Sequence, residues 1–162
     1  MRKFTKNLRG FTLIELLVVI GILSVLLAIV LIAINPQRQF AQANNTKRRA
    51  DANALLNAIG QYSADNKGNL PGNLGTLTRG TEYTIQNGVT NADLCVALMP
   101  TYLSSLPTDP SLNTNPITDC TTYDTGYTVI YGDATDATNR RVTVRAPGTD
   151  LSVEPAVIEV TR

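Results

Sequence analysis

The chain has 162 residues, a formal charge of +1 and no histidine. A charge so close to zero argues against a protein that binds nucleic acid through bulk charge, and the absence of histidine removes the most common general base and a frequent zinc ligand. Beside a membrane segment, this length leaves room for one small soluble domain and no second one.

A basic segment opens the chain, and a long apolar run follows it. Residues 11–34 contain a single ionisable side chain, Glu15. At about 1.5 Å per residue, a helix of this run spans a hydrocarbon core of roughly 30 Å. The basic segment predicts a single-pass orientation with the N-terminus in the cytoplasm. Its four basic residues are Arg2, Lys3, Lys6 and Arg9.

The small residue Gly10 lies directly before the apolar run. A secretory signal peptide has its small-residue cleavage site after the apolar region, and residues 25–35 contain no such pattern. Cleavage after Gly10 would instead remove the basic leader and leave Phe11 as the new N-terminus. An acidic residue near the end of a membrane helix is costly, which indicates that Glu15 is functional and has a partner. A plain membrane anchor explains neither Gly10 nor Glu15.

The sequence RGFTLIELLVVI, residues 9–20, resembles the class III leader of type IV prepilins and type II secretion pseudopilins. The resemblance covers roughly residues 6–34. It implies that prepilin peptidase cleaves after Gly10 and methylates Phe11, and that Glu15 guides subunits into a helical filament. It also implies an assembly ATPase and a membrane platform protein as partners.

A polar but helix-compatible stretch follows the apolar run, so we expect one long helix from about Phe11 to Asn66, with Pro36 as the place where it can break. Apolar residues in its second half recur at spacings of three and four, which predicts one buried stripe. The stripe consists of Phe40, Ala52, Leu55 or Leu56, Ile59 and Tyr62.

Shorter elements are expected after Gly68. Residues 83–85 are a short strand, and residues 93–99 are a short helix that Asp93 caps and Pro100 ends. Residues 126–131 and 141–145 alternate with period two around a turn-rich segment, which predicts a hairpin, and residues 157–161 supply a third strand. The expected fold is therefore α+β and pilin-like, with a long N-terminal helix packed on a small antiparallel sheet.

Three regions follow from this pattern. Residues 1–10 are a cleaved leader, residues 11–35 are a transmembrane and filament-core helix, and residues 36–162 are a periplasmic or extracellular globular domain. Loss of the leader leaves ten basic residues against 13 acidic ones, a net charge of −3.

Cys95 and Cys120 both fall in the part expected outside the cytoplasm, where disulfides persist. A bond between them would close a loop of 24 residues rich in Pro, Asn, Thr and Asp and stabilise the domain by about 3 kcal/mol. The alternative is two free thiols. Without a C-x-x-C spacing or a histidine, a redox or zinc site has no support.

Lys47, Arg48 and Arg49 form the main basic cluster after the leader. We interpret the cluster as a solvated helix face just beyond the membrane. Contact with acidic residues of a neighbouring subunit is the second alternative. DNA binding is the third, and it is disfavoured because no aromatic residue is interleaved with the cluster.

The segment LPTDP, residues 106–110, is similar to the L-P-x-D-P of major pseudopilins, in which a following acidic loop can bind calcium. Turn and cap roles are the preferred interpretation of the acids here, so no metal site is predicted. The candidate oxygen ligands are Asp109, Asp119, Asp124, Asp133 and Asp136.

The sequence contains no Gly-rich phosphate loop and no G-x-S-x-G elbow, so neither an enzyme nor a cofactor is predicted. The predicted function is that of a structural subunit of a type IV pilus-like filament, a homo-oligomer that occupies the cytoplasmic membrane before assembly. The alternatives are a pseudopilin of a type II secretion system, in the periplasm, and a minor pilin that binds DNA or surfaces.

Overall fold

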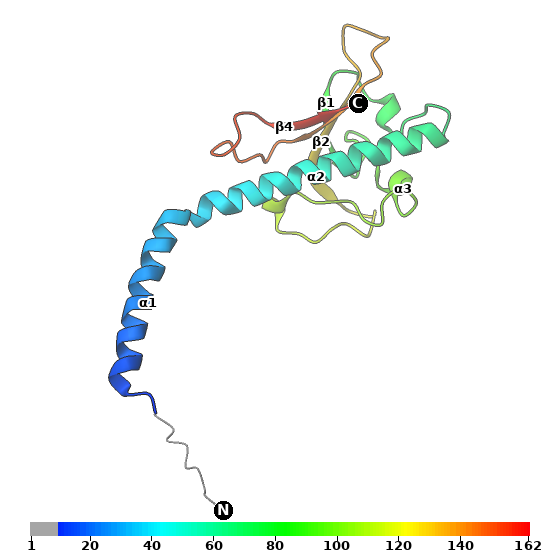
Figure 1. Cartoon of the computed structure of the whole chain (residues 1–162). Coiled ribbons are helices and arrows are strands. Elements are labelled where there is room, and N and C mark those ends of the chain that lie inside the picture. The colour runs from blue at the N-terminus through cyan, green and yellow to red at the C-terminus, as the bar shows by residue number, and fades with distance from the viewer. Residues whose placement is uncertain (1–9) are drawn as a thin grey trace, which may run out of the picture. The chain divides into compact units, whose positions relative to one another are not determined.

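The computed structural model describes residues 10–162, so the four basic leader residues lie outside the described residues. The described residues divide between Gln39 and Phe40 into two compact units. Helix α1 spans Leu13–Ile34, and helix α2 spans Pro36–Asp65 (Figure 1). Between these helices, Asn35 has a left-handed backbone with a φ of 46°. The expected helix is therefore divided just before Pro36, because proline disfavours a helical conformation of the residue that precedes it.

Four strands form one antiparallel sheet in the order β1-β2-β3-β4. Their bounds are Glu82–Gln86, Asp124–Tyr131, Val142–Ala146 and Ile158–Thr161. All the predicted strands are confirmed, and so is the α+β fold. Alternation of buried and outward residues explains their formation: in β3, Val142, Val144 and Ala146 face the core, and Thr143 and Arg145 face outward.

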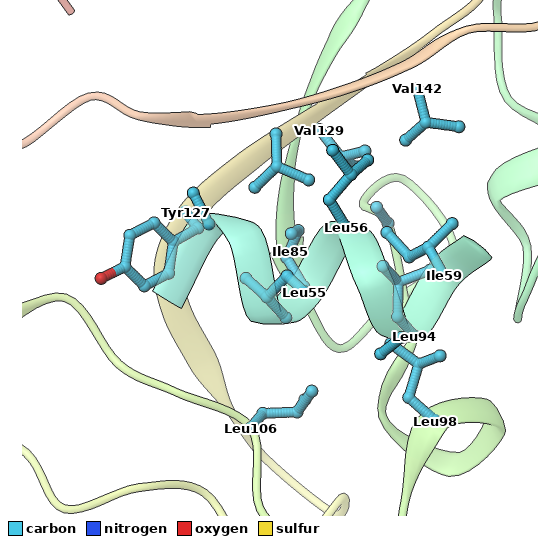
Figure 2. Packing of buried hydrophobic residues seen from close by; sticks show 14 of the residues in the cluster. Leu55, Leu56, Ile59, Ile85, Leu94, Leu98, Leu106, Tyr127, Val129 and Val142 are labelled. Atoms are coloured by element: carbon cyan, nitrogen blue, oxygen red, sulfur yellow. The ribbon is translucent and has the colours of Figure 1, made fainter. Parts of the chain in front are cut away.

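Helix α2 supplies the other half of the core of the second unit. Figure 2 shows Leu55 and Leu56 of α2 directed towards Ile85 and Val129 of the sheet. The predicted stripe is correct at Ala52, Leu55, Leu56 and Ile59, which are at most 4% exposed. It is wrong at Phe40, which is 69% exposed. In the first half of α2, the buried positions are instead Ala41, Asn45 and Arg48.

The predicted short helix is shorter than expected. Helix α3 spans Cys95–Leu98, and its N-cap, Leu94, makes no side-chain cap hydrogen bond. Asp93 does not cap the helix because its Oδ1 accepts a hydrogen bond from the Tyr123 hydroxyl at 2.8 Å. The same hydroxyl oxygen accepts hydrogen bonds from the N–H groups of Leu94 and Cys95, so it takes the capping role.

Candidate functional site at the start of the apolar helix

Helix α1 begins with reciprocal hydrogen bonds between Thr12 and Glu15. The backbone N–H and the hydroxyl of Thr12 donate to Glu15 Oε2 at 2.8 and 2.7 Å. The Glu15 N–H donates in return to Thr12 Oγ1 at 3.3 Å. This arrangement is a capping box, in which N–H groups left free at the helix start find acceptors. Sequence reasoning selected Glu15 but missed Thr12, although the T-x-x-E spacing carries the signal.

Gly10 and Phe11 lie before this cap and outside α1. Both are exposed, and a Cβ added at Gly10 would meet no atom of the described residues within 4 Å. The fold of residues 10–162 therefore gives no steric reason for a glycine at this position.

The apolar helix is uncovered on every face. All residues from Leu13 to Ala33 are exposed, and this stretch is long and apolar enough to cross a membrane. A helix that is apolar all round is stable only when something apolar surrounds it. Lipid, or a bundle of such helices, is the environment that this segment needs. In the described part of the chain, no basic side chain forms an ion pair with Glu15.

The interpretation of the basic cluster is wrong for its central residue. Arg48 is 3% exposed, and its Nε and Nη2 donate to the two carboxylate oxygens of Asp109 at 2.8 and 2.9 Å. Arg49 pairs instead with Glu154 on the surface, and Lys47 Nζ donates to the Thr108 carbonyl. The three basic side chains therefore bind α2 to the rest of the globular domain of the same chain.

The surroundings of this ion pair shift the pKa values of both partners. Burial alone would raise the pKa of Asp109, but hydrogen bonds from Arg48 and Ser111 outweigh it and hold that pKa below its usual range. The hydrogen bond to Asp109 raises the pKa of Arg48. Beside the pair, burial raises the pKa of Asp51, whose carboxylate accepts a hydrogen bond from the Tyr127 hydroxyl at 2.8 Å. Both shifts favour the charged forms of Arg48 and Asp109 inside the domain.

Two glycines make room for Asp109. A Cβ on Gly126 would lie 2.9 Å from the Asp109 Cβ, and a Cβ on Gly148 would lie 3.0 Å from its Oδ2. Gly126 also has a φ of +72°, a conformation that side-chain-bearing residues rarely adopt. The LPTDP segment is therefore held by Arg48 on one side and by two close backbone approaches on the other.

Four of the five candidate calcium ligands accept hydrogen bonds within turns, and the fifth, Asp109, pairs with Arg48. Asp119, Asp133 and Asp136 each accept hydrogen bonds from the N–H and the hydroxyl of the threonine two residues on. Asp124 accepts from the Gly126 N–H in the same way. Within residues 10–162, these acids do not gather into a group that could hold a metal ion. The hydrogen bonds of Asp119, Asp124, Asp133 and Asp136 confirm the predicted turn roles for these four acids.

Cys95 and Cys120 are bonded to each other, with their Cα atoms 5.5 Å apart. The bond ties buried Cys95 of α3 to the loop that leads into β2.

Comparison with protein-family models gives one finding: residues 5–31 match the prokaryotic N-terminal methylation motif. The matched segment contains Gly10, Phe11, Thr12 and Glu15 and most of α1. No curated protein and no solved structure matched the chain. The methylation motif and the exposed apolar helix together indicate insertion into a membrane through α1. Over residues 5–31, the chain is therefore similar to the N-terminal segment of type IV pilins and pseudopilins.

Proposed function

We propose that this protein is a structural subunit of a type IV pilus-like filament and assembles through α1. The observation that carries the proposal is the lone carboxylate of Glu15 at the start of a helix exposed on every face. Such a helix is stable in lipid and equally in a bundle of identical helices, so it can pass from one to the other. The acid offers one fixed polar contact within an otherwise uniform apolar surface.

Processing is the first step of the proposal. Prepilin peptidase removes residues 1–10 and methylates Phe11, which leaves a cationic amine four residues before Glu15 in the chain. The cleaved chain then remains in the cytoplasmic membrane with its N-terminus inside and residues 36–162 outside, until an assembly ATPase and a membrane platform protein move it into the filament. Support for the cleavage site comes from Gly10, which the fold itself does not require.

A pseudopilin of a type II secretion system is the second candidate. It is favoured by the LPTDP segment, whose Asp109 is buried and paired with Arg48. A minor pilin that binds DNA is disfavoured, because Arg48 and Arg49 of the basic cluster are already paired within the domain. All three candidates are structural proteins, in keeping with the motif at residues 5–31.

The test has two parts, processing and abundance. Mass spectrometry of the mature protein should give a chain that begins at Phe11 and carries one methyl group, and Gly10→Val should leave the full precursor in the membrane. A mature chain that still begins at Met1 would contradict the proposal. Many copies in sheared surface fibres indicate a pilus subunit, whereas copies confined to the periplasm of a secreting cell indicate a pseudopilin.

A further inference from the structure

A cavity of about 270 Å³ opens beside the second half of α2. Its buried lining is apolar and comes from Leu56 and Ile59 of α2 and Val142 of β3. Two exposed arginines, Arg140 and Arg162, line its outer part. The cavity therefore suits an apolar group with negative charge beside it.

Both arginines are available to a partner. In the described part of the chain, neither Arg140 nor Arg162 forms an ion pair with an acidic side chain. The Arg162 backbone pairs with that of Val142, and its side chain lies near Gly60 of α2, where an added Cβ would be 3.5 Å from Nη1.

The loop between β3 and β4, residues 147–157, is complementary to this cavity because it combines an exposed apolar side chain with acidic residues. Leu151 is 61% exposed, and the loop contains two acids, Asp150 and Glu154, and no basic residue. The loop is anchored to α2 at two places. Asn45 exchanges two hydrogen bonds of 3.0 Å with the Asp150 backbone, and Arg49 pairs with Glu154. Leu151 is thus an apolar side chain presented on a fixed acidic loop.

The cavity and the loop lie at opposite ends of the same two strands. Val142 opens β3 beside the cavity, and the loop follows Ala146 at the other end of that strand, as the course of β4 in Figure 1 also shows. Five residues of strand span about 17 Å, so Leu151 cannot reach the cavity of its own chain. When an apolar side chain matches a pocket elsewhere on the same molecule, the contact repeats from copy to copy and builds an open filament.

We propose that Leu151 of one copy seats in the Arg140–Arg162 cavity of the next copy, with Asp150 beside the two guanidinium groups. The inference rests on the proposed filament function and adds a contact between globular domains to the contact through α1. The exposed side chains of Val89 and Val96 line a different cavity, which contains the carboxylate of Asp93. Like charges would repel the acidic loop there.

Cysteine cross-linking in the full-length chain tests this contact. The two native cysteines are already bonded to each other, so only the introduced cysteines have free thiols that can form cross-links. Leu151→Cys combined with Ser63→Cys, a residue of the cavity, should give a ladder of covalent multimers when filaments are mildly oxidised. Leu151→Cys combined with Ala97→Cys, a residue of the other cavity, is the matched control and should stay monomeric. Adding Arg140→Glu to the first pair should lower the multimer fraction about tenfold, because it places an acid opposite the acidic loop.

Each outcome decides the proposal. Monomers only from the Leu151–Ser63 pair, or an equal ladder from the control pair, would overturn it. If the chain forms no filaments, the filament function fails, and the cross-link is then measured on the chain in the membrane. A ladder there supports the docking contact without the filament, whereas monomers there overturn both.

Discussion

Replacing Asp109 with alanine should be among the most damaging substitutions in the globular domain. The change leaves the guanidinium of Arg48 without a partner at a position that is 3% exposed. It also removes the acceptor of the Ser111 N–H and hydroxyl, which now donate to Asp109 Oδ1 at 2.8 and 2.5 Å. Removing one partner of a buried ion pair costs about 3–5 kcal/mol.

For a folded unit of this size, 1 kcal/mol shifts Tm by about 4 °C, so Asp109→Ala should lower Tm by about 10–20 °C. Near-UV circular dichroism of the full chain in detergent measures this loss, since the signal follows the tyrosines of the domain. The matched control is Arg49→Met, which removes the neighbouring but exposed arginine and should change Tm far less. The double variant Arg48→Met/Asp109→Leu should recover most of the loss, because it leaves no buried charge unpaired.

The same pair predicts how stability depends on pH. The pKa of Asp109 is lower in the folded chain than its unfolded value of about 3.9. The contribution of Asp109 to the free energy of unfolding is therefore complete above the unfolded pKa, and it is lost as the pH falls through the lower, folded pKa. Equal Tm values for Asp109→Ala and Arg49→Met at pH 7 would refute the assignment of a buried, ionised pair.

Three further outcomes are expected. Glu15→Leu should be inserted and cleaved normally and yet be absent from fibres, while Leu16→Ile should assemble; normal fibre yield from Glu15→Leu in cells without the wild-type copy would remove its assembly role. Cys95→Ser with Cys120→Ser should lower stability by about 2–5 kcal/mol, measured by urea unfolding, and an unchanged midpoint would show that the bond is dispensable. Gly126→Ala should cost at least about 1–2 kcal/mol, because its backbone is left-handed and its Cβ would lie 2.9 Å from Asp109, whereas Gly75→Ala, with ordinary space around it, should be nearly neutral in the same assay.

The elements that the sequence predicts well are those with a local signal. The strands alternate between buried and outward residues, and α1 is a continuous apolar run, so each could be recognised from a few neighbouring residues. The capping box of Thr12 and Glu15 has an equally local signal, the T-x-x-E spacing, although sequence reasoning selected only Glu15. Such features depend on contacts between residues close in the chain, which a single sequence displays directly.

The buried pair of Arg48 and Asp109 could not be recognised in this way. A charged residue in a polar stretch of helix normally faces water, and its partner lies 61 residues further along the chain. The apolar spacing therefore predicts a stripe through Phe40, whereas the face that packs on the domain continues through Asn45 and Arg48. Only the folded chain shows that polar side chains form part of the core.

Polar contacts thus play different parts in the two units. In the globular domain, Arg48 and Asp109 form their ion pair and hydrogen bonds within one chain. The pair therefore holds the LPTDP segment in place and is not available to a partner. In α1, Glu15 is bonded only to Thr12 among the described residues and remains exposed. Its hydrogen bonds to Thr12 reduce the cost of carrying a carboxylate into lipid, and a cationic donor from another subunit can replace them with little net loss of hydrogen bonding. Under the proposed filament function, an ion pair between Glu15 and the amine of another subunit would therefore stabilise the filament relative to the free subunit.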